Sequence, residues 1–218
     1  LRSKRFVRRM AVAMVLVMGS TFAALQANAD PTARGENSTI DRYMELNLGS
    51  DKSQYLIHPD LNVLNGQTDA TLEAWVYPTS TSGYTSIFSK ENNFVFGLIN
   101  GQVWTAVSNG SAWIQNYSDF IVPANAWTHI AFIKIGTSLV IFINGQEAAF
   151  FPGGSYQTFR GNTGLAADSL YIGRRNNTQY LSGRIDEVRI WSTDRRGQIA
   201  ADMHLSLIHI SEPTRQAE

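Results

Sequence analysis

The feature of this sequence that most constrains its fold is a series of short apolar runs separated by turn-forming residues. The runs are rich in Val, Ile, Phe, Tyr, Trp and Thr, and Gly, Asn, Asp or Pro stands between them. This pattern is typical of β-strands joined by tight turns. The strands that it predicts are residues 43–48, 54–58, 71–78, 85–90, 93–99, 102–107, 111–117, 127–135, 138–143, 146–151, 169–175 and 183–191.

Two Asn-Gly pairs indicate which of these strands are direct neighbours. Asn100-Gly101 and Asn144-Gly145 each stand alone between two consecutive runs. A two-residue turn of type I′ needs positive φ at both positions, which Asn and Gly tolerate best. We therefore expect an antiparallel hairpin at each pair.

Very little of the sequence has a helical pattern. Only residues 194–203 are expected to form a helical turn, with Asp194 as its N-cap. About a dozen short strands with so little helix predict an all-β fold, an antiparallel two-sheet jelly-roll sandwich.

The start of the chain has the order of a secretory signal peptide. Residues 1–29 begin with five Lys and Arg, continue with an apolar stretch and end with the small triplet A-N-A before Asp30. The apolar stretch is interrupted and is shorter than the roughly 20 residues of a membrane-spanning helix. We therefore expect cleavage before Asp30 and a protein that is secreted, periplasmic or on the cell surface.

The other end of the chain has a different origin in our interpretation. Residues 205–218 resemble the in-frame translation of a transposase adapter used to build sequencing libraries, so we expect a non-native tail. Domains downstream of His204 are then expected to be missing. Residues 30–40 are polar and predict a flexible leader. The folded domain is therefore expected to cover residues 41–204.

Charge and cysteine content exclude several classes of function. The predicted signal peptide and tail carry six of the 18 basic residues but only two of the 18 acidic ones, so the chain between them is mildly acidic. This charge gives no reason to expect a nucleic-acid partner. The sequence has no cysteine, which excludes disulfides and thiolate metal sites.

Two adjacent carboxylates, Asp186 and Glu187, are the most conspicuous candidates for catalysis. Neighbours on a strand point to opposite faces, so these two are not expected to straddle one glycosidic bond as a catalytic pair. Alternation predicts that Asp186 points inward with Val188, while Glu187 and Arg189 face solvent. An inward carboxylate needs either hydrogen bonds or a metal, and both a structural Asp186 and a calcium ligand stay open.

Five segments occur in an order that resembles a known family. They read ATLEAWVYP, NAWTHIAFIK, LVIFINGQE, LYIGRR and GRIDEVRIWSTDRRGQIAADM, and they are similar to the laminin-G-like branch of the concanavalin-A-like lectin/glucanase superfamily over residues 43–203. The resemblance implies a jelly-roll sandwich, often a bound calcium ion, and often a glycan or protein ligand. It implies Asp186 as the metal ligand. The alternating carboxylates E-x-D-x-E of the family's glucanases do not occur in this sequence.

Aromatic residues are the remaining candidates for ligand contact. Trp104, Trp113 and Tyr117 are predicted to contact a ligand, because flat rings with a polar edge suit sugar faces. The alternative is that these rings fill the core.

Together these features predict a secreted, non-catalytic recognition module that binds carbohydrate, is stabilised by calcium and was once part of a longer protein. Its expected partner is a glycan or an extracellular protein. One alternative is a protein-binding or structural adhesion module of the cell envelope. The other is a divergent glycoside hydrolase, or the accessory domain of a truncated one.

Overall fold

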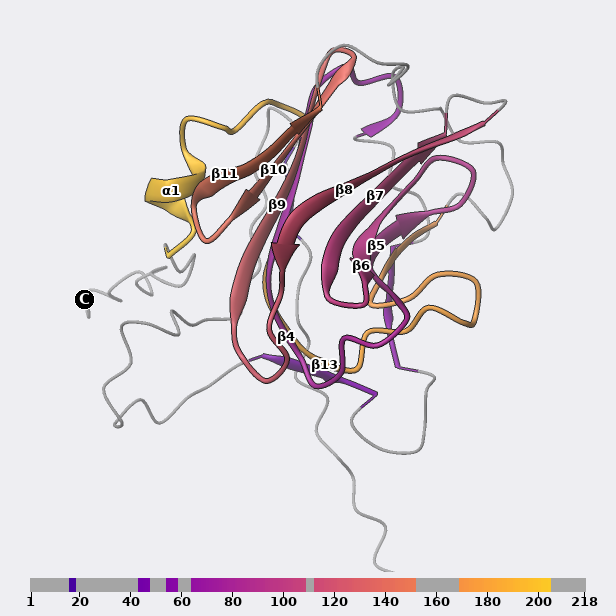
Figure 1. Cartoon of the computed structure of the whole chain (residues 1–218). Coiled ribbons are helices and arrows are strands. Elements are labelled where there is room, and N and C mark those ends of the chain that lie inside the picture. Colours follow the sequence, from indigo (N-terminus) through magenta and orange to yellow (C-terminus); the bar gives the residue numbers. More distant parts are fainter. Residues whose placement is uncertain are drawn as a thin grey trace, which may run out of the picture.

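Two β-sheets pack face to face in the computed structural model (Figure 1). It describes residues 16–18, 43–47, 54–58, 64–108, 112–151 and 169–204, with only the backbone of 16–18, 150 and 151. The predicted leader and tail, and the predicted signal peptide apart from residues 16–18, lie outside the described residues. Their boundaries stay predictions.

The first sheet has seven strands among the described residues, in the order β1-β13-β4-β9-β10-β11, with β2 also paired to β13. All pairs are antiparallel except β1 with β13, and β1 falls within the predicted signal peptide. The strands are β1 (Leu16–Met18), β2 (Met44–Leu46), β4 (Ala70–Pro78), β9 (Thr128–Ile135), β10 (Ser138–Ile143), β11 (Gln146–Phe151) and β13 (Gly183–Trp191).

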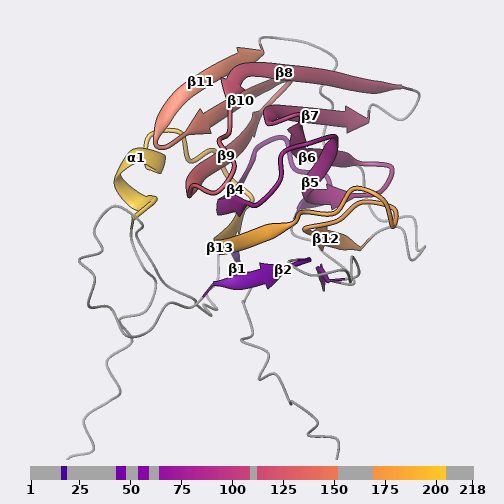
Figure 2. The ribbon, with the colours of Figure 1, turned by 60° about the horizontal axis from the view of Figure 1, so that its bottom comes forward.

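The second sheet has six strands in the described part of the chain, in the order β3-β12-β5-β6-β7-β8, and all its pairs are antiparallel. Its last strand, β8, runs beside β11 of the first sheet (Figure 2). The strands are β3 (Leu56–His58), β5 (Tyr84–Lys90), β6 (Phe94–Ile99), β7 (Gln102–Ser108), β8 (Trp113–Ile121) and β12 (Leu170–Ile172).

These strands confirm the predicted all-β sandwich. Both expected hairpins form, because φ is positive at Asn100 (51°), Gly101 (83°), Asn144 (48°) and Gly145 (79°), as a type I′ turn requires. The largest differences are at β8, which ends four residues later than predicted, and at β2 and β12, which are shorter by three and four residues. Strand ends depend on pairing with distant segments, which a local pattern does not contain.

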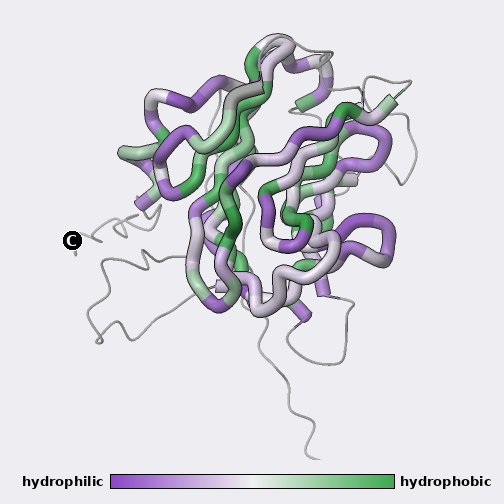
Figure 3. The backbone as a smooth tube through the Cα atoms, viewed as in Figure 1, coloured by the Kyte–Doolittle hydropathy of each residue, from purple (hydrophilic) through white to green (hydrophobic). Residues whose placement is uncertain are grey.

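The core lies between the two sheets and is built from alternate residues of each strand. Phe96 of β6 stacks on Phe132 of β9 with ring centroids 4.6 Å apart, and Phe88 of β5 meets Phe132 edge-on. All three side chains are buried, which stabilises the fold by about 1.5–3 kcal/mol each. Figure 3 shows the hydrophobic positions along the strands and the hydrophilic ones in the connections.

A short helix, α1 (Ile199–Asp202), covers the outer face of the seven-stranded sheet (Figures 1 and 2). Ile199 packs on Ala131 and Val140 of that face. The helical turn was predicted, but its N-cap was wrong: Gln198 is the N-cap, and Asp194 accepts a hydrogen bond from the Arg196 N–H instead. Among the described residues, no helix has the length and hydropathy needed to cross a bilayer.

Candidate functional site

A β-bulge in β13 changes where the two adjacent carboxylates point. The register between β13 and β4 shifts between Asp186 and Arg189, and Glu187 has a φ of 47°. Asp186 stands opposite Trp75 on the outer face, whereas Val188 lies in the core. The prediction that Asp186 points inward with Val188 was therefore wrong. One extra residue in a bulge interrupts the period of two on which that prediction depended.

Glu187 joins a buried charge network on the same outer face. Its Oε2 accepts a hydrogen bond of 2.7 Å from Arg189, and Arg189 is 3.8 Å from the carboxylate of Glu73. Glu73 also accepts hydrogen bonds from Trp191 Nε1, at 2.9 Å, and from His129 Nε2, at 3.2 Å. Glu187 was expected to face solvent with Arg189, but both side chains are almost fully buried. The prediction of opposite faces for Asp186 and Glu187 was also wrong.

The network sets the charge states of its members. Burial raises the pKa of Glu73, but the hydrogen bond from His129 and the guanidinium of Arg189 outweigh it and hold that pKa below its usual value. Burial lowers the pKa of His129 despite the nearby carboxylate, so its imidazole is neutral at pH 7 and Nε2–H is the donor. Burial also raises the pKa of Glu187, against the attraction of Arg189.

The C-terminal part of the described chain covers this network. Arg189 donates to the Asp202 carbonyl at 3.1 Å, and Trp75 Nε1 donates to the Met203 carbonyl at 2.9 Å. The Arg195 guanidinium lies 4.0 Å above the Trp191 ring and pairs with Asp202. A substrate would reach the buried carboxylates only after this segment moved away. The network therefore fits a structural role, holding the segment on the sheet.

The contacts of Asp186 bear on the predicted calcium site. Its Oδ1 accepts a hydrogen bond from the Glu187 N–H at 2.8 Å. No group of three or more His, Cys, Asp or Glu side chains within the described ranges could hold a metal ion, whereas calcium takes six to eight oxygen ligands. Carbonyl and water oxygens, which also bind calcium, are not counted in such a group of side chains, so calcium binding through Asp186 stays a prediction.

The outer face of the six-stranded sheet is chemically different. The exposed large apolar side chains of the described residues all belong to strands of this sheet. Isolated exposed apolar residues are ordinary, but several on one sheet mark a candidate binding surface. They are Ile57 on β3, Tyr84 on β5, and Tyr117, Phe120 and Ile121 on β8.

Two of the predicted ligand-contact residues meet on this face. Trp104 of β7 stands directly opposite Tyr117 of β8, so both side chains lie on the same side of the sheet. Tyr84 of β5 meets the Trp104 ring edge-on, with centroids 5.2 Å apart. Tyr84 and Tyr117 are 46% and 41% exposed, whereas Trp104 is only 2% exposed. The buried Trp104 thus packs beneath the two tyrosines, and only the tyrosine rings are accessible to a ligand.

A glutamine fixes the polar edge of this cluster. Gln115 Oε1 accepts hydrogen bonds from Trp104 Nε1, at 3.1 Å, and from the Tyr117 hydroxyl, at 3.3 Å. Gln115 is exposed, and its amide nitrogen makes no hydrogen bond with a described residue, so its two N–H groups can donate to a ligand. We call Tyr84, Trp104, Gln115 and Tyr117 the aromatic face.

A glycine beside Trp104 leaves the sheet surface next to the indole without a side chain. Gly97 of β6 stands opposite Trp104, and a Cβ built on it would collide with the main-chain oxygen of Thr85. The collision arises where β5 is irregular, between Ser86 and Phe88. Position 97 therefore requires glycine, and no side chain covers this side of the Trp104 indole.

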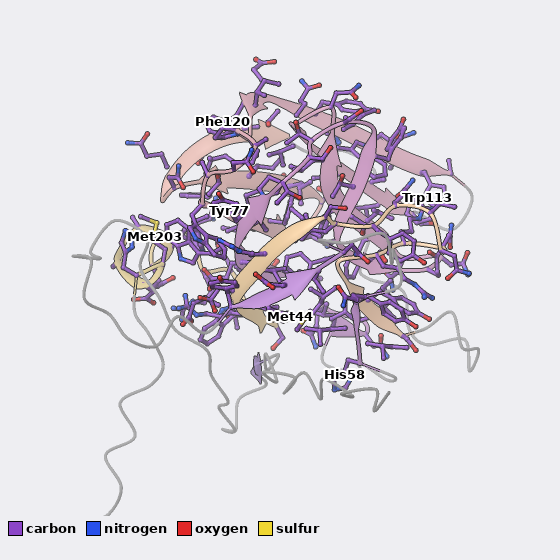
Figure 4. The ribbon with its side chains drawn as sticks, turned by 90° about the horizontal axis from the view of Figure 1, so that it is seen from below. Met44, His58, Tyr77, Trp113, Phe120 and Met203 are labelled. Carbon is purple, nitrogen blue, oxygen red and sulfur yellow. The ribbon has the colours of Figure 1, made fainter. Side chains whose placement is uncertain are left out.

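Trp113, the third predicted contact residue, adjoins the aromatic face and packs against the cluster of Val95, Trp104 and Ala106. It is four residues before Tyr117 on the same side of β8, a separation of about 13 Å along the strand. The guanidinium of Arg175 lies 4.9 Å from its ring centroid. Figure 4 shows Trp113 and Met203 on opposite sides of the molecule, which separates this sheet face from the charge network.

Tyr55, Tyr171 and Arg174 form a further cluster on this face that was not predicted from the sequence. The Arg174 guanidinium lies 4.0 Å from the centroid of Tyr55 and 4.6 Å from that of Tyr171. Ser89 Oγ donates to the Arg174 carbonyl at 2.7 Å and fixes its main chain. Alternation in the run 54–58 could have placed Tyr55 outward, but nothing local relates it to Arg174.

Fold and surface together define a lectin-type jelly-roll sandwich with an aromatic outer face. The laminin-G model described as "Concanavalin A-like lectin/glucanases superfamily" matches residues 49–198. The chain belongs to this superfamily, as its sequence resemblance predicted. A search of functionally curated proteins finds no match.

Solved structures with the same fold come from bacteria and from an animal. Domain 4 of AbnA, a GH43 extracellular arabinanase from Geobacillus stearothermophilus in complex with arabinotriose, is 24% identical, with a TM-score of 0.58 over 75% of this chain and 77% of that one. The CBM40 of the Ruminococcus gnavus IT-sialidase, bound to α2,3-sialyllactose, is 15% identical, with a TM-score of 0.54 over 65% and 89%. A heptameric SAP-like pentraxin from Limulus polyphemus is 14% identical, with a TM-score of 0.51 over 71% and 78%. These likenesses concern the fold.

Proposed function

We propose that this chain is a carbohydrate-binding module that binds its glycan on the aromatic face. The observation that carries the proposal is the pair of half-exposed rings, Tyr84 and Tyr117, on either side of the buried indole of Trp104. Aromatic rings of this kind suit the apolar faces of sugars. The arabinotriose and sialyllactose in two proteins of similar fold support the same class of ligand.

The geometry gives each residue of the aromatic face a task. Tyr84 and Tyr117 stack on sugar rings, and Trp104 holds them in place because it is itself packed in the sheet. Gln115 supplies directed N–H donors for a hydroxyl or ring oxygen, since its carbonyl oxygen is already engaged. Preorganised side chains lose little conformational entropy on binding, which favours affinity.

The proposed module acts outside the cytoplasm and without catalysis of its own. The signal-peptide pattern of residues 1–29 supports export. The engagement of the buried carboxylates Glu73 and Glu187 by Arg189, beneath the C-terminal segment, argues against the hydrolase alternative. Attachment to a catalytic domain fits a module of this kind and is part of the proposal.

Glycan-array screening followed by calorimetry with the best ligand tests the proposal. Tyr84→Ala and Tyr117→Ala should each weaken binding about tenfold, since 1.4 kcal/mol is one decade in Kd. Tyr117→Phe is the matched control, because it keeps the ring and loses only the hydroxyl bond to Gln115. If no glycan binds, the proposed function is wrong. If binding is unchanged in both alanine variants, the aromatic face is not the binding site.

A further inference from the structure

Arginines stacked on aromatic rings recur in this fold, and their pairing differs in one case. Four such arginines occur among the residues that the structure describes: Arg174, Arg175, Arg184 and Arg195. Three of them also have a protein carboxylate as ion-pair partner: Arg175 has Glu91 at 3.6 Å, Arg184 has Glu45 at 3.5 Å, and Arg195 has Asp202. Arg174 has no such partner within the described ranges.

The closest counterpart of Arg174 is Arg184. Its guanidinium stands between Tyr43, at 4.6 Å, and Tyr77, at 5.1 Å, and pairs with the half-exposed Glu45. Arg174 contacts the rings of Tyr55 and Tyr171 at similar distances, 4.0 and 4.6 Å. In both sites an arginine contacts two tyrosine rings, although Tyr55 and Tyr171 also touch each other, with ring centroids 5.8 Å apart. Among the described residues, only Arg184 has a carboxylate beside it.

Arg174 is left with unused hydrogen-bonding capacity. Its side chain donates no hydrogen bond to a described residue, and its Nε, like those of Arg175, Arg184 and Arg195, is buried without a hydrogen-bond partner. A guanidinium is always charged and has five N–H donors in a planar fork. Contact with the two tyrosine rings restricts the orientation of the guanidinium, and its fork of N–H groups can hold a carboxylate by two parallel hydrogen bonds.

We propose that Arg174 binds a carboxylate of the ligand, so that the glycan carries acidic sugars. The inference rests on the proposed carbohydrate-binding function and narrows its ligand to saccharides with a carboxyl group. The ligand's carboxylate takes the place that Glu45 occupies beside Arg184. Contact with Tyr55 and Tyr171 orients the guanidinium to donate two parallel N–H···O hydrogen bonds to that carboxylate.

The strand register connects this site with the aromatic face. Tyr171 of β12 stands opposite Ser89 of β5. The row of cross-strand neighbours continues with Val95 of β6 and Ala106 of β7 and ends at Gln115 of β8. Four strand spacings separate Tyr171 from Gln115, a distance of about 19 Å. A ligand that reaches both sites is therefore an oligosaccharide with at least one acidic residue near Arg174.

The experiment compares acidic glycans with their neutral counterparts on the full chain. The probes are polygalacturonate, polyglucuronate, polymannuronate and sialyllactose, each before and after reduction of its carboxyl groups. We expect at least one acidic probe to bind about tenfold more tightly than its reduced form, and Arg174→Gln to abolish this preference. Arg184→Gln is the matched control, with the same change in charge and the same loss of stacking, and it should keep the preference.

Further variants separate binding from folding. Arg174→Lys keeps the charge but loses the fork, so it should retain only part of the preference, and thermal unfolding of each variant checks that the domain is intact. Equal binding of acidic and reduced probes, or a preference that survives Arg174→Gln, overturns the inference while the proposed function stands. Absence of binding to every glycan, acidic or neutral, overturns both.

Discussion

The buried charge network makes a sharp prediction about stability. Replacing Glu73 by Gln keeps the shape of the side chain and removes its charge. Glu73 accepts hydrogen bonds from His129 and Trp191 and neutralises Arg189 together with Glu187. The glutamine has only one acceptor oxygen, so it can keep one of the two hydrogen bonds, and Arg189 is left with a single carboxylate whose own pKa is raised by burial.

The expected cost follows from the burial of the network. Removing one partner of a buried ion pair typically costs 3–5 kcal/mol. Because Arg189 keeps its 2.7 Å bond to Glu187, we expect Glu73→Gln to lower the free energy of unfolding by about 3 kcal/mol, the low end of this range. Urea denaturation, followed by tryptophan fluorescence, measures the change.

A matched control lies on the same sheet. Glu45 also pairs with an arginine, Arg184, but its side chain is 49% exposed. Glu45→Gln should therefore change stability by less than about 1 kcal/mol. If Glu73→Gln costs no more than Glu45→Gln, the network does not hold the C-terminal segment on the sheet, and the structural role assigned to it is refuted.

Three further predictions test other parts of the molecule. Burial lowers the pKa of His129 below 6.5, so the unfolded chain takes up more protons and stability should fall as pH drops below 6.5; His129→Gln should flatten this dependence in urea titrations down to about pH 5. Gly97→Ala should destabilise the domain by about 1–3 kcal/mol through its collision with Thr85, whereas Gly197→Ala, where a methyl meets nothing within 4 Å, should be nearly neutral in thermal melts. Calcium binding through Asp186 predicts a higher melting temperature at millimolar calcium for the wild type but not for Asp186→Asn; an unchanged wild-type midpoint would count against it.

The sandwich could be predicted because its signals are local. The Asn-Gly pairs at residues 100–101 and 144–145 determine two hairpins through turn chemistry alone. The alternation of apolar residues along single strands then indicates which side chains enter the core. Neither signal depends on distant parts of the chain, so both could be read without a structure.

The bulge in β13 had no such signal. A left-handed conformation is usually marked by Gly or Asn, whereas here Glu187 adopts it. The extra residue reverses the direction of Asp186 relative to Val188, so the argument from strict alternation failed at the residues it was meant to decide. The argument against a catalytic pair now depends on contacts instead of on opposite faces. Asp186 accepts a hydrogen bond from the Glu187 N–H, and Glu187 is buried in an ion pair with Arg189.

The binding surface was predictable only in part. Trp104 and Tyr117 came from residue type, and the β7–β8 register brings them together. Tyr84 was not singled out, because its contact with Trp104 crosses β6. The Arg174 stack joins residues more than a hundred positions apart, Tyr55 and Tyr171, and it exists only because β12 lies beside β3. Contacts of this kind follow from sheet order, which no local pattern encodes.

The two outer faces of the sandwich therefore differ in how their polar and aromatic side chains are paired. On the seven-stranded sheet, charged side chains are buried under the C-terminal segment, and each cation of that cluster has its anion: Arg189 has Glu187 and Glu73, and Arg195 has Asp202. On the six-stranded sheet, tyrosines stay exposed and Arg174 has no anion among the described residues. Internal pairing stabilises the first face, whereas the rings and donors of the second face that have no partner among the described residues are the ones that the proposed ligand would engage.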